Sequence, residues 1–222
     1  MNSEAFQRLL CAHAVRSLEK QFHLQELAGE DDWSADLDAG TFSIGRYTWR
    51  CELLGSESSI SNTWQWGWAN TDGYSADVLR TSLELRSLGS QTQVPELTEP
   101  QFPLDTIGAH ALSLVAVGVS GADAYYRGPY DDGAAFLIIR DPAFPSLPAM
   151  TADRFSNLFT TLIRRFAVAD HRGALQAYAA SGAVALRSDG ASDRLEFNDG
   201  SGLTCTFDHL NRLTALEGRL ER

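Results

Sequence analysis

The 222-residue sequence has no apolar run close to the roughly 20 residues that a helix needs to cross a bilayer. Its first 20 residues distribute charged side chains along their length, unlike the positively charged and then apolar layout of a secretion signal. We therefore expect a protein that stays in the cytoplasm and has no membrane partner. Export by a route that leaves no such segment stays open.

Cysteine is scarce as well. The three cysteines, Cys11, Cys51 and Cys205, are odd in number, far apart and surrounded by apolar residues. This usage is typical of buried, reduced thiols and not of disulfides. Because no Cys-x-x-Cys pair and no Cys/His spacing typical of zinc occurs, the sequence predicts no metal site, and no cofactor is expected.

Positive charge is in short supply. The chain has 18 lysine and arginine residues against 29 aspartate and glutamate residues, which gives a net charge of −11, and Lys20 is its only lysine. Nucleic acids and anionic membranes need a basic surface, so this balance argues against them as main partners. The excess of carboxylates instead predicts a basic protein as partner.

Recognisable catalytic motifs are missing. The sequence contains no Gly-x-Gly-x-x-Gly, Walker loop, His-Glu-x-x-His or Gly-x-Ser-x-Gly. His110 lies in an apolar helical segment, where a hydrogen-bonded core residue is preferred over a general base. The five histidines are dispersed, without a second histidine at ligand spacing: His13, His23, His110, His171 and His209. We assign no catalytic residue, and an enzyme of unrecognised type stays open.

The sequence does contain helical and strand patterns that indicate an α+β protein, with helices packed on antiparallel sheet. Residues 33–70 are typical of a β-meander, and residues 90–103, which contain three prolines, of a loop. Two further strands are expected within 122–128 and 134–141. Apolar spacing and capping residues predict helices over residues 3–28, 74–88, 104–118 and 151–181, the last of them kinked or split at Gly173.

Three prolines between Pro142 and Pro148 mark the expected boundary between two modules. Residues 1–141 would form a tryptophan-rich α+β module, and residues 151–222 a helix followed by an antiparallel meander. The Asn-Asp-Gly-Ser-Gly sequence at 198–202 is a strong hairpin signal. The strands of this meander are expected near 183–188, 193–198, 203–208 and 212–218. One continuous domain is the alternative.

All five tryptophans lie between residues 33 and 68, and Trp64, Trp66 and Trp68 alternate with smaller or polar residues. Because side chains alternate in direction along a strand, we expect these three indoles to share one face. The preferred interpretation is a core face, since large aromatics on strands most often pack inward. The alternative is a stacking platform for a sugar, a base or a partner's side chain.

The segment LLGSESSISNTWQWGWAN, residues 53–70, resembles the signature of an uncharacterised bacterial family of unknown function. Members show an Asp-x-Asp-x-Gly strand, matched here by Asp36, Asp38 and Gly40, then Leu-Gly-Ser and the three alternating tryptophans. A later segment, YYRGPYDDGAAFLII, resembles the family's Tyr-Arg-x-Pro stretch. The resemblance covers residues 30–140 and implies no known activity.

The most acidic stretch of the chain contains Asp31, Asp32, Asp36 and Asp38. Asp36 and Asp38 are expected on one face of a strand, where they either hold a divalent cation or form a solvated acidic edge.

Arg127 follows two tyrosines near the end of an expected strand. It either clamps a carboxylate or phosphate of a ligand, or pairs with Asp131 or Asp132, which are expected in a turn.

Two functions from different classes fit these features. The first is a non-catalytic protein-binding protein, such as an immunity-type inhibitor that neutralises a basic partner like a bacterial toxin. Its contact surface would include Asp31, Asp32, Asp36 and Asp38. The alternative is a small-molecule-binding protein, or an enzyme of unrecognised type, that uses the tryptophan face together with Arg127.

Overall fold

The computed structural model describes residues 3–219 and confirms the α+β class with antiparallel sheets. Its elements in chain order are α1 (Glu4–Ala28), β1 (Trp33–Asp36), β2 (Thr41–Ile44), β3 (Tyr47–Ser58), β4 (Thr63–Trp66), the 3₁₀ turn η1 (Gly67–Ala69), α2 (Arg80–Thr92), the 3₁₀ turn η2 (Pro95–Leu97), β5 (Gln101–Pro103), α3 (Ala109–Ser120), β6 (Ala124–Tyr130), β7 (Gly133–Ile139), α4 (Ala152–Arg165), α5 (His171–Ala180), β8 (Ala185–Asp189), β9 (Ser192–Glu196), β10 (Gly202–Phe207) and β11 (Leu213–Arg219).

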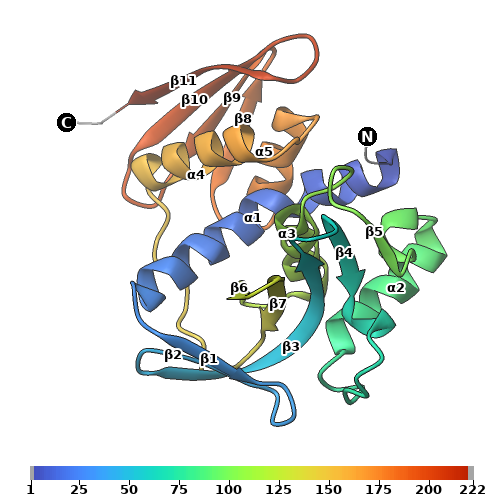
Figure 1. Ribbon diagram of the computed structural model, residues 1–222. Coiled ribbons are helices and arrows are strands. Elements are labelled where there is room, and N and C mark those ends of the chain that lie inside the picture. The colour runs from blue at the N-terminus through green and yellow to red at the C-terminus, as the bar shows by residue number, and fades with distance from the viewer. Residues whose placement is uncertain (1–2, 220–222) are drawn as a thin grey trace.

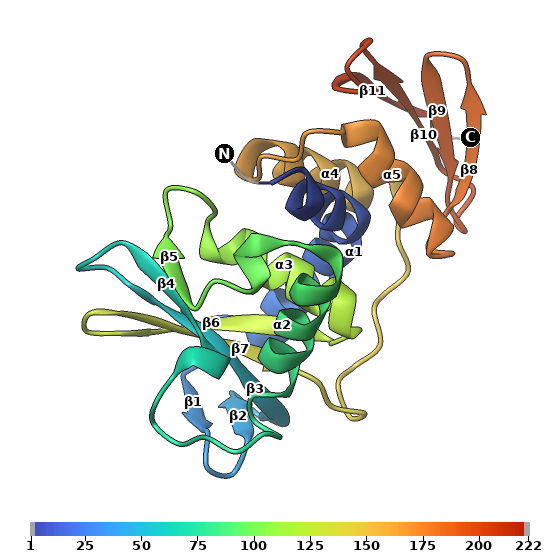
Figure 2. The same ribbon diagram turned by 90° about the vertical axis from the view of Figure 1, so that its right-hand side faces the viewer.

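Helix α1 runs through the middle of the molecule (Figure 1). It begins where the Ser3 hydroxyl accepts a hydrogen bond from Phe6 N (3.1 Å), which satisfies one N–H group of the first turn. One side of α1 packs closely on α3, because Gly118 has no side chain that would collide with His13. The other side contacts α4 and α5, so α1 lies between the first sheet with its helices and the C-terminal elements (Figure 2).

The first sheet is organised around the long strand β3. This strand pairs with β2 through residues 47–50, with β4 through 55–58 and with β7 along 51–58. Strands β1, β5 and β6 extend the sheet beyond β2, β4 and β7 respectively. All of these pairs are antiparallel, which confirms the predicted meander.

Strand β3 contributes to two clusters of buried side chains. Cys51 and Leu53 join a smaller cluster with Phe42 and Trp49, while Leu54 joins the main cluster. Successive side chains of a strand point to opposite faces, and the register of β3 on β7 shifts between Leu53 and Gly55. Both faces of β3 are therefore covered around residues 51–54, where Glu52 is buried, whereas Arg50 is exposed.

The C-terminal strands form a separate four-stranded antiparallel sheet in the order β11-β10-β9-β8, as the predicted meander requires. Helices α4 and α5 cover it (Figure 1). The ring of Phe155 lies 5.4 Å from that of Phe159, 5.4 Å from Tyr178 and 5.9 Å from Phe197. The apolar stripe of α4 is thereby buried between α5 and the residue that follows β9.

Buried side chains on both sides of the predicted module boundary belong to one hydrophobic cluster. It includes Phe6 and Leu10 of α1, Trp66 of β4 and Phe155 of α4. The division into modules at residues 141 and 151 stays a prediction.

Three of the four predicted helices differ from the observed ones. The expected helix 74–88 begins only at Arg80, after turns that include Gly73 with a φ of +81°. The helix 104–118 begins at Ala109, behind the N-cap Gly108.

The helix 151–181 is two helices, α4 and α5. The break comes at residues 166–170 and not at Gly173, because the Asp170 side chain caps a new helix by accepting from Gly173 N (2.7 Å).

Within residues 90–103, expected to be a loop, Gln101–Pro103 form β5 by pairing with β4. Among residues 3–219, no helix combines the length and the apolar character needed to span a membrane.

Candidate functional site

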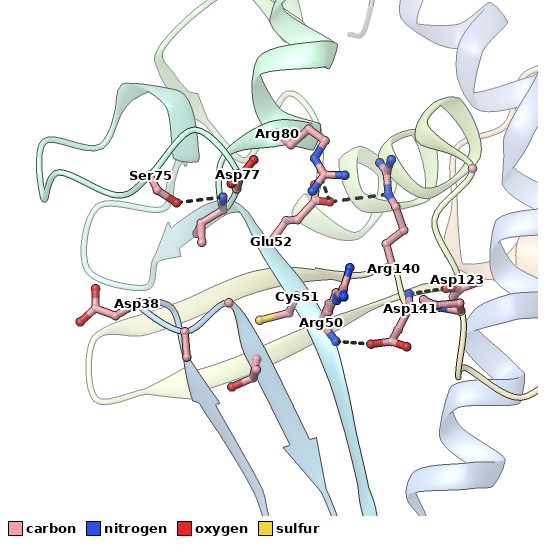
Figure 3. A pocket seen from close by; sticks show the side chains of 16 residues that line it. Asp38, Arg50, Cys51, Glu52, Ser75, Asp77, Arg80, Asp123, Arg140 and Asp141 are labelled. Atoms are coloured by element: carbon pink, nitrogen blue, oxygen red, sulfur yellow. Dashed lines mark hydrogen bonds and ion pairs between the residues drawn. The ribbon is translucent and has the colours of Figure 1, made fainter.

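A cleft of about 720 Å³ opens beside the middle of β3 (Figure 3). We call it the β3 cleft. The β1–β2 turn and the segment before α2 form one part of its wall, and the ends of α3 and β7 form another. Its charged lining residues are Asp38, Arg50, Glu52, Asp77, Arg80, Asp123, Arg140 and Asp141.

Glu52 forms the buried base of this cleft, with 6% of its side chain exposed. One carboxylate oxygen accepts hydrogen bonds from Thr81 N (2.8 Å) and Thr81 Oγ1 (2.6 Å). The other lies 3.8 Å from Arg80 Nε and 3.6 Å from Arg140 Nε, so Glu52 stands between the two arginines (Figure 3). A buried carboxylate needs such partners, because an unpaired charge is costly away from water. The two arginines are therefore occupied in the fold.

The carboxylates of Asp123 and Asp141 are also used by the fold. Asp141 accepts from Arg50 N (2.9 Å) and Ala143 N (2.8 Å), and Asp123 accepts from Asp141 N (2.9 Å) (Figure 3). These bonds fix the end of β7 against β3. By contrast, Asp38 and Asp77 are exposed at the mouth of the cleft and make no ion pair within residues 3–219.

The structure separates the four predicted acidic residues. All four are exposed, and Asp38 lines the β3 cleft whereas Asp31 lines a second cleft described below. The expectation that Asp36 and Asp38 share a strand face is wrong, because β1 ends at Asp36 and Asp38 lies in the following turn. Asp36 closes that turn by accepting from Ala39 N (2.9 Å), a common role of aspartate in turns.

The tryptophans are also separated. Trp64 and Trp66 are fully buried with their rings perpendicular and 5.4 Å apart, which confirms the core interpretation for these two. Strand β4 ends at Trp66, and η1 follows, with Asn70 N donating to Gly67 O (3.0 Å). The expectation that Trp68 continues the same face is therefore wrong. Burial leaves neither Trp64 nor Trp66 an indole face for a ligand.

Trp68 is half-buried, and the guanidinium carbon of Arg86 lies 4.2 Å above its ring. This cation–π contact covers the one indole of the three that reaches the surface. A stacking platform made of all three tryptophans is not formed.

Two glycines in the segments that resemble the family are needed for the packing of tryptophan rings. A Cβ atom on Gly55 would collide with the ring of Trp64, and one on Gly128 would collide with the ring of Trp33. The glycines thus leave the space that the indoles fill.

Arg127 forms an ion pair, but with a partner that the sequence did not suggest. Its Nε donates to Glu57 of β3 at 2.7 Å, and not to Asp131 or Asp132. The two aspartates occupy the β6–β7 turn, as expected. Strand β7 lies between β6 and β3, and the long arginine side chain reaches across it.

Arg127 and Asp31 both line a second cleft of about 670 Å³, which we call the α1–β6 cleft. It is bounded by the second half of α1, by β6 and by the last residue of α4. His110 lines it too, with its Nδ1 2.8 Å from the Tyr125 hydroxyl. The predicted hydrogen bond of His110 is confirmed, but its side chain is exposed and not in the core, because His110 sits in the first turn of α3.

The three thiols are free, and each has a pKa above its ordinary value. Burial and the charge of Glu52 raise the pKa of Cys51 to about 12, and burial with Asp193 raises that of Cys205 to about 12. Cys11 is only half-buried, unlike the prediction, and burial with Asp170 raises its pKa to about 11. Because the thiolate is the reactive form, none of the three is prepared for nucleophilic chemistry.

We expect iodoacetamide at pH 8 to leave Cys51 and Cys205 unmodified in the folded protein and to modify Cys11 slowly, since thiols with these pKa values hold almost no thiolate. Intact-mass measurement over time would show this, and the unfolded chain should take up all three labels quickly. Folded-state labelling of Cys51 at the unfolded rate would contradict the burial described above.

By its fold, this is an α+β protein in which a central helix separates two antiparallel sheets and two clefts flank the first of them. The chain belongs to a family of unknown function (DUF6882), whose family model matches residues 7–142. The predicted resemblance to a family of unknown function is thus confirmed, and the match extends further toward the N-terminus to include most of α1. Searches among curated proteins and among solved structures gave no match.

Proposed function

We propose that this protein is a non-catalytic binding protein that captures a basic partner protein. Its contact surface, which we call the acidic face, consists of the exposed aspartates Asp36, Asp38, Asp72 and Asp77, of which Asp38 and Asp77 line the β3 cleft. More specifically, we propose an immunity-type inhibitor, which covers the cationic cleft of a toxic enzyme.

The main support for this proposal is that none of these four carboxylates forms an ion pair within residues 3–219, although Arg50 and Arg80 line the same cleft. Within residues 3–219, the ion pairs are made by glutamates and by Asp193, and none involves a residue of the acidic face. Like charges kept close together repel one another, and a cationic partner would relieve that repulsion.

Two backbone hydrogen bonds bring the parts of the acidic face together. Cys51 N donates to Gly40 O (2.9 Å), and Leu53 N donates to Val78 O (2.7 Å). The β1–β2 turn and the segment 70–79 are thereby both attached to the same short stretch of β3. Tyr74 belongs to the second of these segments, and its pKa is raised by burial and by the charges of Asp72, in its own segment, and Asp38, in the β1–β2 turn. The electrostatic potentials of the two segments therefore overlap.

Such a face predicts fast, salt-dependent association. Complementary potentials raise the association rate constant far more than they slow dissociation, and salt screens them. The partner would be isolated by co-purification with the tagged protein from its native host at low ionic strength. Association and dissociation rates would then be measured for wild-type protein and for the triple variant Asp38→Asn, Asp72→Asn, Asp77→Asn. Asp36 is kept because it closes a turn.

We expect the triple variant to associate about tenfold more slowly or worse at low salt, with little change in dissociation. A matched control, Asp153→Asn, Asp189→Asn, Glu217→Gln, removes the same charge from exposed positions of the C-terminal elements and should associate as the wild type does. The proposal fails if no protein co-purifies, or if both variants associate equally fast.

A further inference from the structure

The α1–β6 cleft carries an inference that is independent of the acidic face. Its volume of about 670 Å³ lies within the range of small-molecule sites, roughly 300–1,000 Å³. Residues of three segments far apart in sequence meet there: the second half of α1, the start of β6, and Arg165 with Phe166 at the end of α4. The last two lie beyond the part of the chain that matches the family.

Arg165 supplies a positive charge that the rest of the protein leaves unused. Its side chain is exposed, and it makes no ion pair with any carboxylate of residues 3–219. Other arginines, such as Arg50 in the β3 cleft and Arg164, also form no ion pair within these residues, so Arg165 is distinguished by the neutral hydrogen-bonding groups that line its cleft. A guanidinium presents a planar fork of donors that matches a carboxylate in two-pronged geometry.

Neutral hydrogen-bonding groups lie beside this charge. The Tyr125 hydroxyl and His110 Nδ1 are 2.8 Å apart, and Gln21 Oε1 accepts from Tyr125 N (3.4 Å). Partial desolvation, together with the charges of Arg127 and Arg165, lowers the pKa of His110 against the opposing effect of Glu57. His110 therefore stands close to both arginines, and its ring is neutral near pH 7.

The charge balance limits the kind of anion that the cleft can hold. The positive charge of Arg127 is already offset by Glu57, with Arg127 Nε 2.7 Å from the carboxylate. Glu30 and Asp31 line the part of the cleft next to the end of α1 and add negative charge. These carboxylates leave the cleft as a whole without a net positive charge, and Arg165 is the one arginine lining it that forms no ion pair within residues 3–219. A monoanion is therefore favoured over a phosphate monoester, which carries about −1.5 to −2 at pH 7.

The remaining wall is apolar. Leu18 and Phe22 of α1, Tyr126 of β6 and Phe166 line the cleft beside the polar groups. Apolar walls with a few placed polar groups are the usual composition of a small-molecule site.

We propose that the α1–β6 cleft binds a small monocarboxylate, with its carboxylate on Arg165 and the His110–Tyr125 pair and its apolar body against Leu18, Phe22 and Phe166. The carboxylate would receive charge-assisted hydrogen bonds from the guanidinium, and the apolar body would leave water.

Isothermal titration calorimetry with hexanoate, hexanol and hexyl phosphate tests this proposal, because the three probes share a six-carbon chain and differ in the head group. We expect hexanoate to bind the wild-type protein more tightly than either of the other two. The variant Arg165→Gln should weaken hexanoate binding at least about tenfold, as expected for losing a charge-assisted hydrogen bond. It should leave hexanol binding unchanged.

The variant Arg164→Gln is the matched control, since this neighbouring arginine is exposed and does not line the cleft. It should bind hexanoate as the wild type does. Shifts of the His110 ring signals in NMR spectra during the titration should saturate together with the calorimetric signal. The proposal is overturned if hexanoate does not bind, if hexyl phosphate binds more tightly, or if both arginine variants bind hexanoate equally. None of these outcomes depends on the acidic face.

Discussion

Replacing Trp66 by alanine should lower the free energy of unfolding by about 3–5 kcal/mol, the range typical for deleting a buried large aromatic side chain. Trp66 has no exposed surface, and its ring packs against Trp64 within the main hydrophobic cluster. Gly55 of β3, which pairs with Trp66, and the η2 turn, which accepts its indole N–H, are held by backbone hydrogen bonds and cannot easily move inward to fill the space. Chemical denaturation followed by far-UV circular dichroism would measure the change.

A pair of milder substitutions separates hydrogen bonding from packing. Trp66 Nε1 donates to Glu96 O (3.0 Å), whereas the buried Nε1 of Trp64 has no partner within residues 3–219. Trp66→Phe and Trp64→Phe remove the same atoms, but only the first leaves a carbonyl without its donor, at a cost of about 1–3 kcal/mol. We expect Trp66→Phe to be the more destabilising of the two by roughly that amount. Equal losses would show that this hydrogen bond contributes nothing.

Replacing Glu52 by alanine should cost about 3–5 kcal/mol of stability, which is typical of breaking a buried ion pair from one side. The substitution removes the acceptor of Thr81 N and Thr81 Oγ1 and takes away the buried partner of Arg140. Arg140 Nε is buried and forms no hydrogen bond within residues 3–219, so the Glu52 carboxylate 3.6 Å away is the charge that balances it there. Urea unfolding midpoints of the variant and the wild type would give the difference.

Glu84 provides the control for this prediction, because it also pairs with Arg140, at 3.6 Å from Nη2, but has 47% of its side chain exposed. An exposed pair contributes at most about 1 kcal/mol, so Glu84→Ala should be close to neutral. A loss for Glu84→Ala as large as that for Glu52→Ala would mean that burial is not what makes the Glu52 network important.

Much of the candidate site could not be predicted from the sequence. The acidic stretch pointed to Asp36 and Asp38, but Asp77 lies in a segment that was expected to be helical, and Asp72 lies just before it. Glu52 was missed, although a single carboxylate between Cys51 and Leu53 in an apolar strand is a signal for a buried, paired charge. Nothing near Arg165 in the sequence indicates that His110 and Tyr125 lie beside it, because they come from other layers of the fold.

The sequence by itself determined the elements whose pattern is local. Period-two alternation and turn residues predicted the strands of both meanders, and the spacing of apolar residues predicted α1, since these signals act within a few residues. Only the tertiary structure decided where α4 ends, that β5 joins the sheet, and that Trp68 leaves the face of Trp64 and Trp66. Those outcomes depend on contacts between segments far apart in the chain, because the packing energies of such contacts exceed local preferences. The two clefts likewise exist only through such contacts.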